Sequence, residues 1–172
     1  MILEIRPITA GDIEGFHHAV DVVARERKYL AFLEAPPLAS AREFVLENIA
    51  KGNPQFVMIA DGGVVGWCDI IRQTRPIHAH TGVLGMGLLP AHRGRGHGWK
   101  LIEATLHAAK LAGFRRIELA VHADNLRAVA LYERVGFVRE GIKRRATCID
   151  GRFGDTIMMA ITEWEIQNAE TV

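Results

Sequence analysis

The segment from His92 to Gly98 combines residue types that suit the binding of an anion. It reads His-Arg-Gly-Arg-Gly-His-Gly, so glycines alternate with basic side chains. Glycine lets a ligand approach the backbone closely, and Arg93 and Arg95 add positive charge. The segment lies between an expected strand and an expected helix, where unpaired amides and the helix dipole bind phosphate oxygens. The sequence therefore predicts a phosphate site, with a turn that binds nothing as the alternative.

Two common nucleotide-binding patterns do not fit this loop. The Walker pattern requires Gly-Lys followed by Ser or Thr, whereas Gly98 is followed by Trp99 and Lys100. The dinucleotide fingerprint requires Gly-x-Gly-x-x-Gly, whereas the glycines here are Gly94, Gly96 and Gly98. The predicted ligand is anionic, but neither nucleotide motif identifies it.

The loop and a second block downstream resemble the general N-acetyltransferase (GNAT) superfamily. Its acyl-CoA motif, Arg/Gln-x-x-Gly-x-Gly/Ala, is supplied by Arg93, Gly96 and Gly98. The second block comprises Ile117–Val121, Asn125, Ala128, Leu131-Tyr132-Glu133 and Gly136-Phe137. The spacing of that block, with a late hairpin through Asp150-Gly151, is most similar to the small amino-acid and phosphinothricin N-acetyltransferases and their ribosomal-protein acetyltransferase relatives. The resemblance covers roughly residues 2–162.

The resemblance implies acetyl-CoA as cosubstrate and no metal. Backbone groups of a glycine-rich strand would hold the pantetheine arm like an added strand, where a bulge splays the sheet. Loop amides would bind the pyrophosphate, and an asparagine side chain would bind the arm. The implied cofactor-binding residues are Met86, Gly87, Leu88, Arg93, Gly94, Arg95, Gly96, His97, Gly98, Trp99 and Asn125.

The resemblance also implies an acid for catalysis, but it leaves the base open. Tyr132 aligns with the family tyrosine that protonates the departing thiolate, with a packing role as the alternative. Many relatives carry a glutamate on the strand before the loop, whereas Val83 stands at about that place here. His80, just upstream, is the candidate base, either directly or through water, and an exposed loop histidine is the alternative reading.

The implied reaction is direct attack of a neutral amine on the thioester, with strand amides stabilising the oxyanion. We expect an acetyl group to pass to a primary amine of a small molecule, an amino acid or amino-acid-like compound. The expected acceptor-binding residues are Tyr29, Phe32, Glu34, Trp67 and Asp69. Two alternatives stay open: acetylation of a protein N-terminus, as in the ribosomal-protein relatives, and a non-catalytic acyl-CoA-binding module.

Composition excludes several other classes of protein. A net charge of +1 in 172 residues argues against a nucleic-acid binder, and no apolar run approaches the length of a membrane span. Cys68 and Cys148 are widely separated and form no disulfide pattern, so we expect a cytoplasmic setting. Neither these cysteines nor the histidines have metal-ligand spacing, so we expect no metal. Ser40, the only serine, starts an expected capping box with Glu43, which argues against a serine nucleophile. The resemblance implies a homodimer.

The elements that must position these residues form one α/β (α+β) domain. We expect a GNAT acyl-CoA N-acyltransferase fold over residues 1–165, with about seven strands in a mixed, mostly antiparallel sheet, about four helices, and a polar tail over 166–172. Hydrophobic periodicity and turn residues place the elements. The expected strands are 2–8, 55–60, 64–72, 81–89, 115–121, 137–146 and 153–162, and the expected helices are 13–23, 40–52, 98–112 and 128–135.

Overall fold

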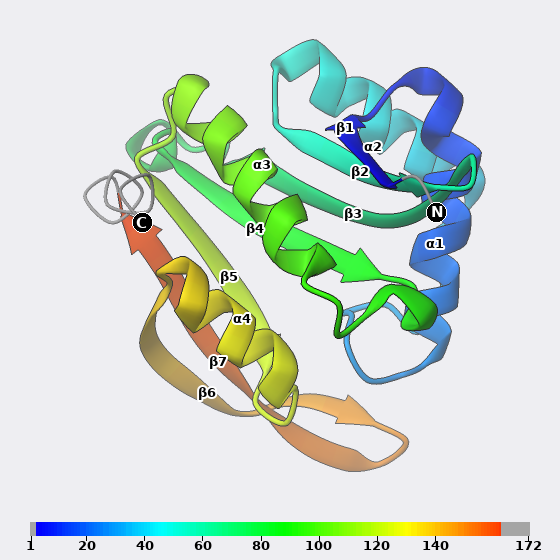
Figure 1. Cartoon of the computed structure of the whole chain (residues 1–172). Coiled ribbons are helices and arrows are strands. Elements are labelled where there is room, and N and C mark those ends of the chain that lie inside the picture. The colour runs from blue at the N-terminus through cyan, green and yellow to red at the C-terminus, as the bar shows by residue number, and fades with distance from the viewer. Residues whose placement is uncertain (1–2, 163–172) are drawn as a thin grey trace.

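A computed structural model of the chain describes residues 3–162. It contains one seven-stranded sheet in the order β1-β2-β3-β4-β5-β7-β6, in which only β4 and β5 are parallel (Figure 1). The strands are β1 (Leu3–Pro7), β2 (Gln55–Ala60), β3 (Gly63–Arg72), β4 (Thr81–Leu88), β5 (Arg116–His122), β6 (Val138–Ile149) and β7 (Arg152–Thr162). The helices are α1 (Ile13–Arg25), α2 (Leu38–Lys51), α3 (His97–Leu111) and α4 (Leu126–Val135), with 3-10 turns at Ala10–Asp12, Pro76–His78 and Pro90–His92.

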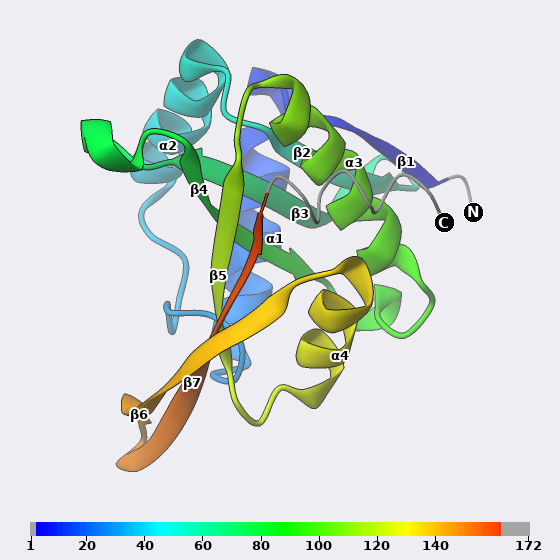
Figure 2. The ribbon, with the colours of Figure 1, turned by 90° about the vertical axis from the view of Figure 1, so that its left-hand side faces the viewer.

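The helices cover both faces of the sheet, as Figures 1 and 2 show. Alternation along β2 and β3 sends neighbouring side chains to opposite faces. Val57 and Trp67 pack in a cluster with α1 and α2. Met58 and Cys68 pack on the other face with α3 and α4. The protein is therefore a three-layer arrangement with two cores separated by the sheet.

The sheet opens between β4 and β5. Their pairing is limited to Thr81–Val83 with Arg116–Glu118, after which the two strands diverge (Figure 1). β4 keeps an unshifted register with β3 along its length, so the expected bulge in this strand is wrong. β5 continues instead along β7, up to the pair His122 and Thr156. The opening therefore follows from each strand keeping its antiparallel partner.

Glycines in β4 reflect close packing across the sheet. A Cβ atom on Gly87 would lie 2.3 Å from the ring of Trp67, its partner on β3. The indole ring fills the space above the strand and itself contacts Phe16 of α1 edge-on, with ring centroids 5.9 Å apart. Aromatic side chains therefore pack directly against the backbone of β4, as the glycine content of the strand predicts.

The expected order of strands and helices is confirmed, with local corrections. α2 begins at Leu38 with Pro37 as its N-cap residue, so the expected capping box at Ser40 and Glu43 is wrong. The Pro37 carbonyl accepts the amide of Ser40 at 2.9 Å, and Ser40 lines the cavity described below. α4 begins at Leu126 rather than at the expected residue 128, and the side chain of its N-cap residue Asn125 accepts the amide of Ala128. The expected tail at 166–172 lies outside the described residues. No helix within 3–162 is long and apolar enough to cross a membrane.

Candidate active site

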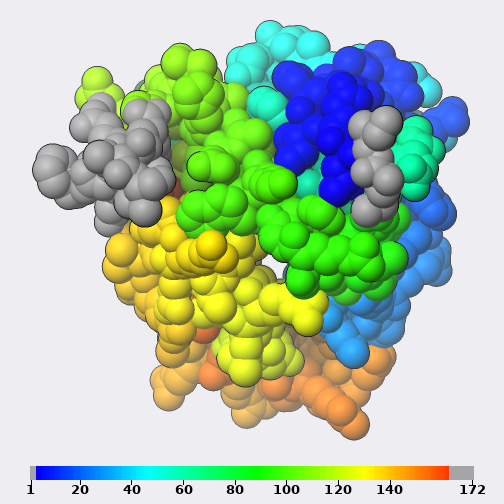
Figure 3. Space-filling model, viewed as in Figure 1, coloured from blue at the N-terminus to red at the C-terminus, as the bar shows by residue number. Residues whose placement is uncertain are grey.

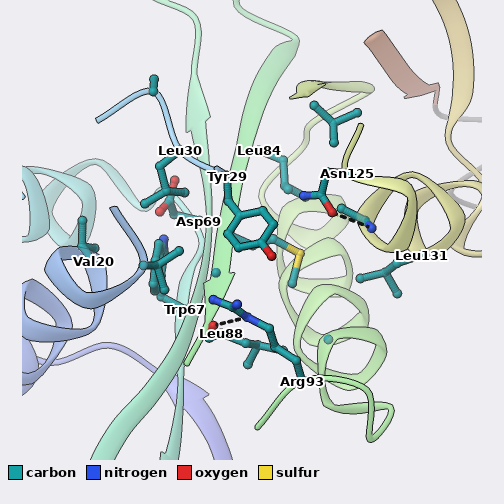
Figure 4. Close-up of a pocket in the computed structure, with 18 of the residues that line it drawn as sticks. Val20, Tyr29, Leu30, Trp67, Asp69, Leu84, Leu88, Arg93, Asn125 and Leu131 are labelled. Carbon is teal, nitrogen blue, oxygen red and sulfur yellow. Dashed lines mark hydrogen bonds between the residues drawn. The ribbon is translucent and has the colours of Figure 1, made fainter. Parts of the chain in front are cut away.

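A cavity of about 980 Å³ occupies the opening between β4 and β5 (Figure 4). It reaches both faces of the sheet, because its lining comes from α1 and the following loop on one face and from α3 and α4 on the other. The lining that matters for chemistry includes Tyr29, Phe32, Trp67, Asp69, Met86, Gly87, Leu88, Arg93, Gly94, Gly96, Gly98, Trp99, Asn125, Arg127 and Tyr132. Most of the residues predicted from the sequence are thus brought together in one place.

The glycine-rich loop forms the N-terminal end of α3 on the cavity wall. Gly94 and Gly96 have positive φ angles of 72° and 78°, and Gly96 is the N-cap residue of the helix. The first amides of the helix lack helical partners and carry the positive end of its dipole. Gly98 is buried, and a Cβ atom there would lie 3.0 Å from Leu131 of α4. Figure 3 shows the resulting hollow between this green loop and the yellow surface of α4.

Arg93 is held by protein groups. Its guanidinium forms two hydrogen bonds with the Glu26 carboxylate, at 2.6 and 2.9 Å, and its Nε donates to the Leu88 carbonyl at 2.8 Å. The same group lies 4.8 Å from the ring centroid of Tyr29. Its charge is therefore balanced by Glu26, and the side chain ties the loop before α3 to the end of α1.

Two arginines that sequence reasoning missed stand beside the loop. Arg127 Nη1 lies 3.7 Å from where a Cβ atom of Gly94 would be, and Arg127 lines the cavity. Arg134 lies over the ring of Trp99, 4.8 Å from its centroid. Their spacing of seven residues puts both on one face of α4, which was the available signal. Of the predicted cofactor residues, Arg95 and His97 are not part of the cavity lining.

Tyr132 and Asn125 lie on the α4 side of the cavity. Tyr132 is 8% exposed and packs edge-on against Phe137. Burial raises the pKa of the Tyr132 hydroxyl, so that it keeps its proton at neutral pH. The Oδ1 atom of Asn125 accepts the amide of Ala128 at 3.2 Å, which fixes its side chain at the start of α4 (Figure 4).

Four of the five acceptor-binding residues expected from the sequence lie on the cavity wall, and one does not. Tyr29, Phe32, Trp67 and Asp69 line the cavity. Glu34 does not line it: its side chain is 71% exposed and lies 3.4 Å from Arg25. Asp69 is 8% exposed, and burial raises the pKa of its carboxyl group to about 7. A carboxyl group of this kind on a cavity wall marks a candidate functional residue.

The residue predicted as the base lies elsewhere. His80 immediately precedes β4, at the end of the strand where β4 still pairs with β5, and it is not part of the lining. Its carbonyl oxygen accepts the amides of Arg115 and Arg116 at 3.0 and 3.2 Å. The cavity instead begins at Leu84, further along the strand. The structure thus brings Tyr132 and Asp69, but not His80, to the cavity. Within residues 3–162, no three acidic, histidine or cysteine side chains are grouped as a metal site would need.

The sheet, the opening between β4 and β5, and the loop at the start of α3 define an acyltransferase of the GNAT type. The acetyltransferase (GNAT) family matches residues 23–137, and the chain belongs to this family. It is similar to the N-alpha-acetyltransferase RimI of Mycobacterium tuberculosis, with 36% identity over 117 residues that cover 67% of this chain and 69% of the relative.

Two further proteins extend the comparison. The L-amino acid N-acetyltransferase AaaT of Escherichia coli is 31% identical over 110 residues, covering 63% of this chain and 68% of the relative. The phosphinothricin acetyltransferase of Sinorhizobium meliloti, solved in complex with acetyl-CoA, superposes with a TM-score of 0.88 at 20% identity, over 94% of this chain and 89% of that one. The protein is thus an N-acetyltransferase, while its relatives act on different acceptors.

Proposed function

We propose that this protein transfers the acetyl group of acetyl-CoA to the primary amine of a small molecule in a ternary complex. One observation carries the proposal: a single cavity joins the N-terminal end of α3 to a buried carboxyl group, through the opening between β4 and β5. A donor bound on the α3 side and an amine bound on the α1 side would therefore meet at β4.

The cavity suits the donor. Amides from Gly94 to Trp99 would bind the pyrophosphate without intervening side chains, and Arg127 would add charge beside them. The β4 segment Met86–Leu88 faces the opening where its pairing with β5 has ended, so its backbone groups would pair with the pantetheine arm. Asn125 would contact the same arm from the start of α4.

The residues at the opening supply the chemistry of acyl transfer. The amine nitrogen attacks the thioester carbonyl carbon, and β4 amides stabilise the negative charge that develops on the carbonyl oxygen. When the C–S bond breaks, the protonated Tyr132 hydroxyl gives its proton to the thiolate. Sequestration in a cavity holds the two reactants in position.

The loop between α1 and α2 favours a small acceptor over a protein N-terminus. Three successive residues at the start of this loop are bonded to other parts of the fold. Glu26 pairs with Arg93, and Arg27 forms two hydrogen bonds with Asp150. The Lys28 carbonyl lies 2.8 Å from Nδ1 of His122. These contacts narrow the entrance from that side. A peptide substrate would require an open groove there.

The lining on the acceptor side is mostly aromatic and aliphatic. Phe16, Val20, Phe44 and Trp67 contribute to it. Within the described part of the chain, the ionisable groups on this side, apart from the Tyr29 hydroxyl, are the Asp69 carboxyl, the already paired Arg93 guanidinium and the His17 imidazole, whose Nε2 atom lies 2.8 Å from the Pro36 carbonyl. We therefore propose an amine carried on an apolar body. An amino acid, the acceptor expected from the sequence, stays a prediction, because its carboxylate would need a cationic partner in the cavity.

A matched acceptor panel tests both points. Thiol release is measured with pairs that differ only by a carboxylate, phenylalanine with phenethylamine and leucine with isopentylamine, together with spermidine and an alanine-terminated peptide. Faster turnover of the carboxylate-free member of each pair is expected. A preference for the amino acids would restore the prediction from the sequence, and a preference for the peptide would favour the protein-directed alternative.

The non-catalytic alternative has a distinct outcome in the same assay. A binding module would take up acetyl-CoA, measured by calorimetry, and release thiol with no acceptor in the panel. Cytoplasmic location and a homodimer stay predictions, of which sedimentation of the full chain at micromolar concentration tests the second.

A further inference from the structure

Asp69 occupies an unusual place at the acceptor side of the cavity. It lies on β3 directly opposite Gly85 of β4, and its Oδ1 atom is 3.4 Å from where a Cβ atom of Gly85 would be. Paired residues of antiparallel strands project to the same face, so a side chain at position 85 would lie in contact with the carboxylate. The glycine leaves the Asp69 carboxylate beside the backbone of β4.

The groups around Asp69 do not neutralise it. On β2 its partner is Gln55, whose Oε1 accepts a hydrogen bond from Asn48 of α2 at 3.0 Å. From α1, the Nε2 atom of His17 lies 2.8 Å from the Pro36 carbonyl. The loop after α1 contributes Tyr29, and Arg93 is paired with Glu26. No salt bridge to Asp69 is formed within residues 3–162.

A buried carboxylate without an ion partner is costly to keep in a folded protein. The cost is explained if a ligand brings the missing partner. An amine that enters the acceptor side of the cavity brings N–H groups and a proton that must be removed. β4 supplies no carboxylate for this step, and its Val83 is apolar and lies outside the lining.

Resting on the proposed function, we propose that Asp69 is the general base of the reaction, supplied by β3 in place of a carboxylate on β4. As the amine lone pair forms the N–C bond to the acetyl carbon, one Asp69 oxygen takes the surplus proton from the nitrogen. The C–S bond then breaks, and Tyr132 gives its proton to the thiolate. Asp69 afterwards releases a proton to solvent and Tyr132 regains one, so the products are the amide and free thiol.

The two groups are placed for these opposite transfers. Asp69 shares its face of the sheet with Trp67 and α1, whereas Tyr132 belongs to the core with α3 on the other face. Figure 4 shows Asp69 on one side of the β4 ribbon and, on the other, Asn125, the N-cap residue of the helix that contains Tyr132. Burial, which raises the Asp69 pKa to about 7, also matches the carboxyl group to proton transfer near neutral pH.

The test compares the wild type with Asp69→Asn and His80→Gln. We measure kcat/KM from about pH 5.5 to about pH 9 by thioester absorbance, using two amines of different basicity. The wild-type profile should bend near pH 7, at the same pH for both amines, because the bend belongs to the enzyme. Asp69→Asn should lower kcat about 100-fold and lose the bend. His80→Gln should keep both the rate and the bend.

Several outcomes would overturn the inference. One is an Asp69→Asn enzyme whose pH profile keeps the bend. A second is an Asp69→Asn enzyme in which only KM changes, because this would mean that Asp69 merely binds the ammonium group. Another is loss of the bend in His80→Gln. Acetyl-CoA binding by calorimetry verifies the fold of each variant. Where Asp69→Asn fails to bind, Asp69→Glu must bind and keep a bend; failure of both variants makes Asp69 structural and overturns the inference.

The proposed function fails in a different way. A wild type that binds acetyl-CoA and acetylates no amine overturns both the function and the base. An active wild type with an unaffected Asp69→Asn variant overturns the base alone.

Discussion

The Arg93 guanidinium and the Glu26 carboxylate form a two-pronged ion pair between the loop before α3 and the end of α1. Their side chains are 18% and 24% exposed, so solvent screens the pair less than it would on the open surface. Arg93 also donates to the Leu88 carbonyl, at the end of the strand expected to hold pantetheine. The arginine of the acyl-CoA motif therefore positions other groups, and its charge is already matched.

A double-mutant cycle should detect this coupling. We expect Arg93→Gln and Glu26→Gln each to lower the free energy of unfolding by roughly 1–2 kcal/mol, and the double variant to lose less than their sum, with a coupling of about 1 kcal/mol. Urea unfolding at neutral pH measures all three variants. The exposed pair Arg25 and Glu34, 3.4 Å apart, is the control and should show no measurable coupling.

The same variants separate positioning from direct contact with phosphate. If Arg93 acts through position, Glu26→Gln weakens acetyl-CoA binding about as much as Arg93→Gln, since both release the loop. Loss of affinity confined to Arg93→Gln would instead indicate that the guanidinium touches the donor.

Gly96 and Gly113 offer a matched pair for the phosphate loop. They flank α3 with φ angles of 78° and 82°, and a Cβ atom on either would meet nothing within 4 Å. Glutamate at either position should therefore cost a similar backbone strain of roughly 1–2 kcal/mol. Only Gly96→Glu places an anion on the cavity wall, so only it should abolish acetyl-CoA binding in calorimetry. Unchanged binding would refute the assignment of the loop.

Tyr132→Phe removes one hydroxyl group and leaves the ring against Phe137. We expect kcat to fall about 100-fold while the acetyl-CoA Kd stays near the wild-type value, because the hydroxyl acts when the thiolate departs. Steady-state kinetics and calorimetry measure the two quantities. Tyr29→Phe removes the hydroxyl of an expected acceptor-binding residue on the same cavity wall and serves as the comparison; it should change the acceptor KM rather than kcat. A drop in unfolding temperature without a fall in kcat would mean that Tyr132 only packs.

The order of elements was predictable because local signals carry it. Asp61-Gly62 and Asp150-Gly151 adopt the positive φ angles that tight hairpins require, and both hairpins lie where the sequence predicts them. The start of α2 was not predictable from the Ser40 pattern, because Pro37 already supplies the first carbonyl acceptor. Pro37 offers no capping side chain, so the helix begins three residues before the capping pattern that the sequence shows.

The glycine loop and the tyrosine were found from motifs, whereas the surroundings of Asp69 required tertiary structure. The sequence places Asp69 in a strand, but its burial depends on packing by α1. The space beside its carboxyl group depends on Gly85 having no side chain. Likewise Glu26 meets Arg93 across 67 residues, a separation at which no sequence period operates. Proximity along the chain favoured His80, which the fold leaves outside the cavity wall.

Asp69 should also make stability depend on pH. Its folded pKa of about 7 exceeds the ordinary value of 3.8, so between these values the folded chain holds a proton that the unfolded chain has released. The free energy of unfolding should therefore fall as pH rises from about 4 to about 7 and level off above that. Asparagine cannot titrate, so Asp69→Asn should gain on the wild type across this window, by roughly 4 kcal/mol at its upper end. Urea unfolding at about pH 5 and about pH 8 measures the difference. A difference that does not change with pH would mean that the carboxyl group titrates normally, and would remove the physical support for Asp69 as a base near neutral pH.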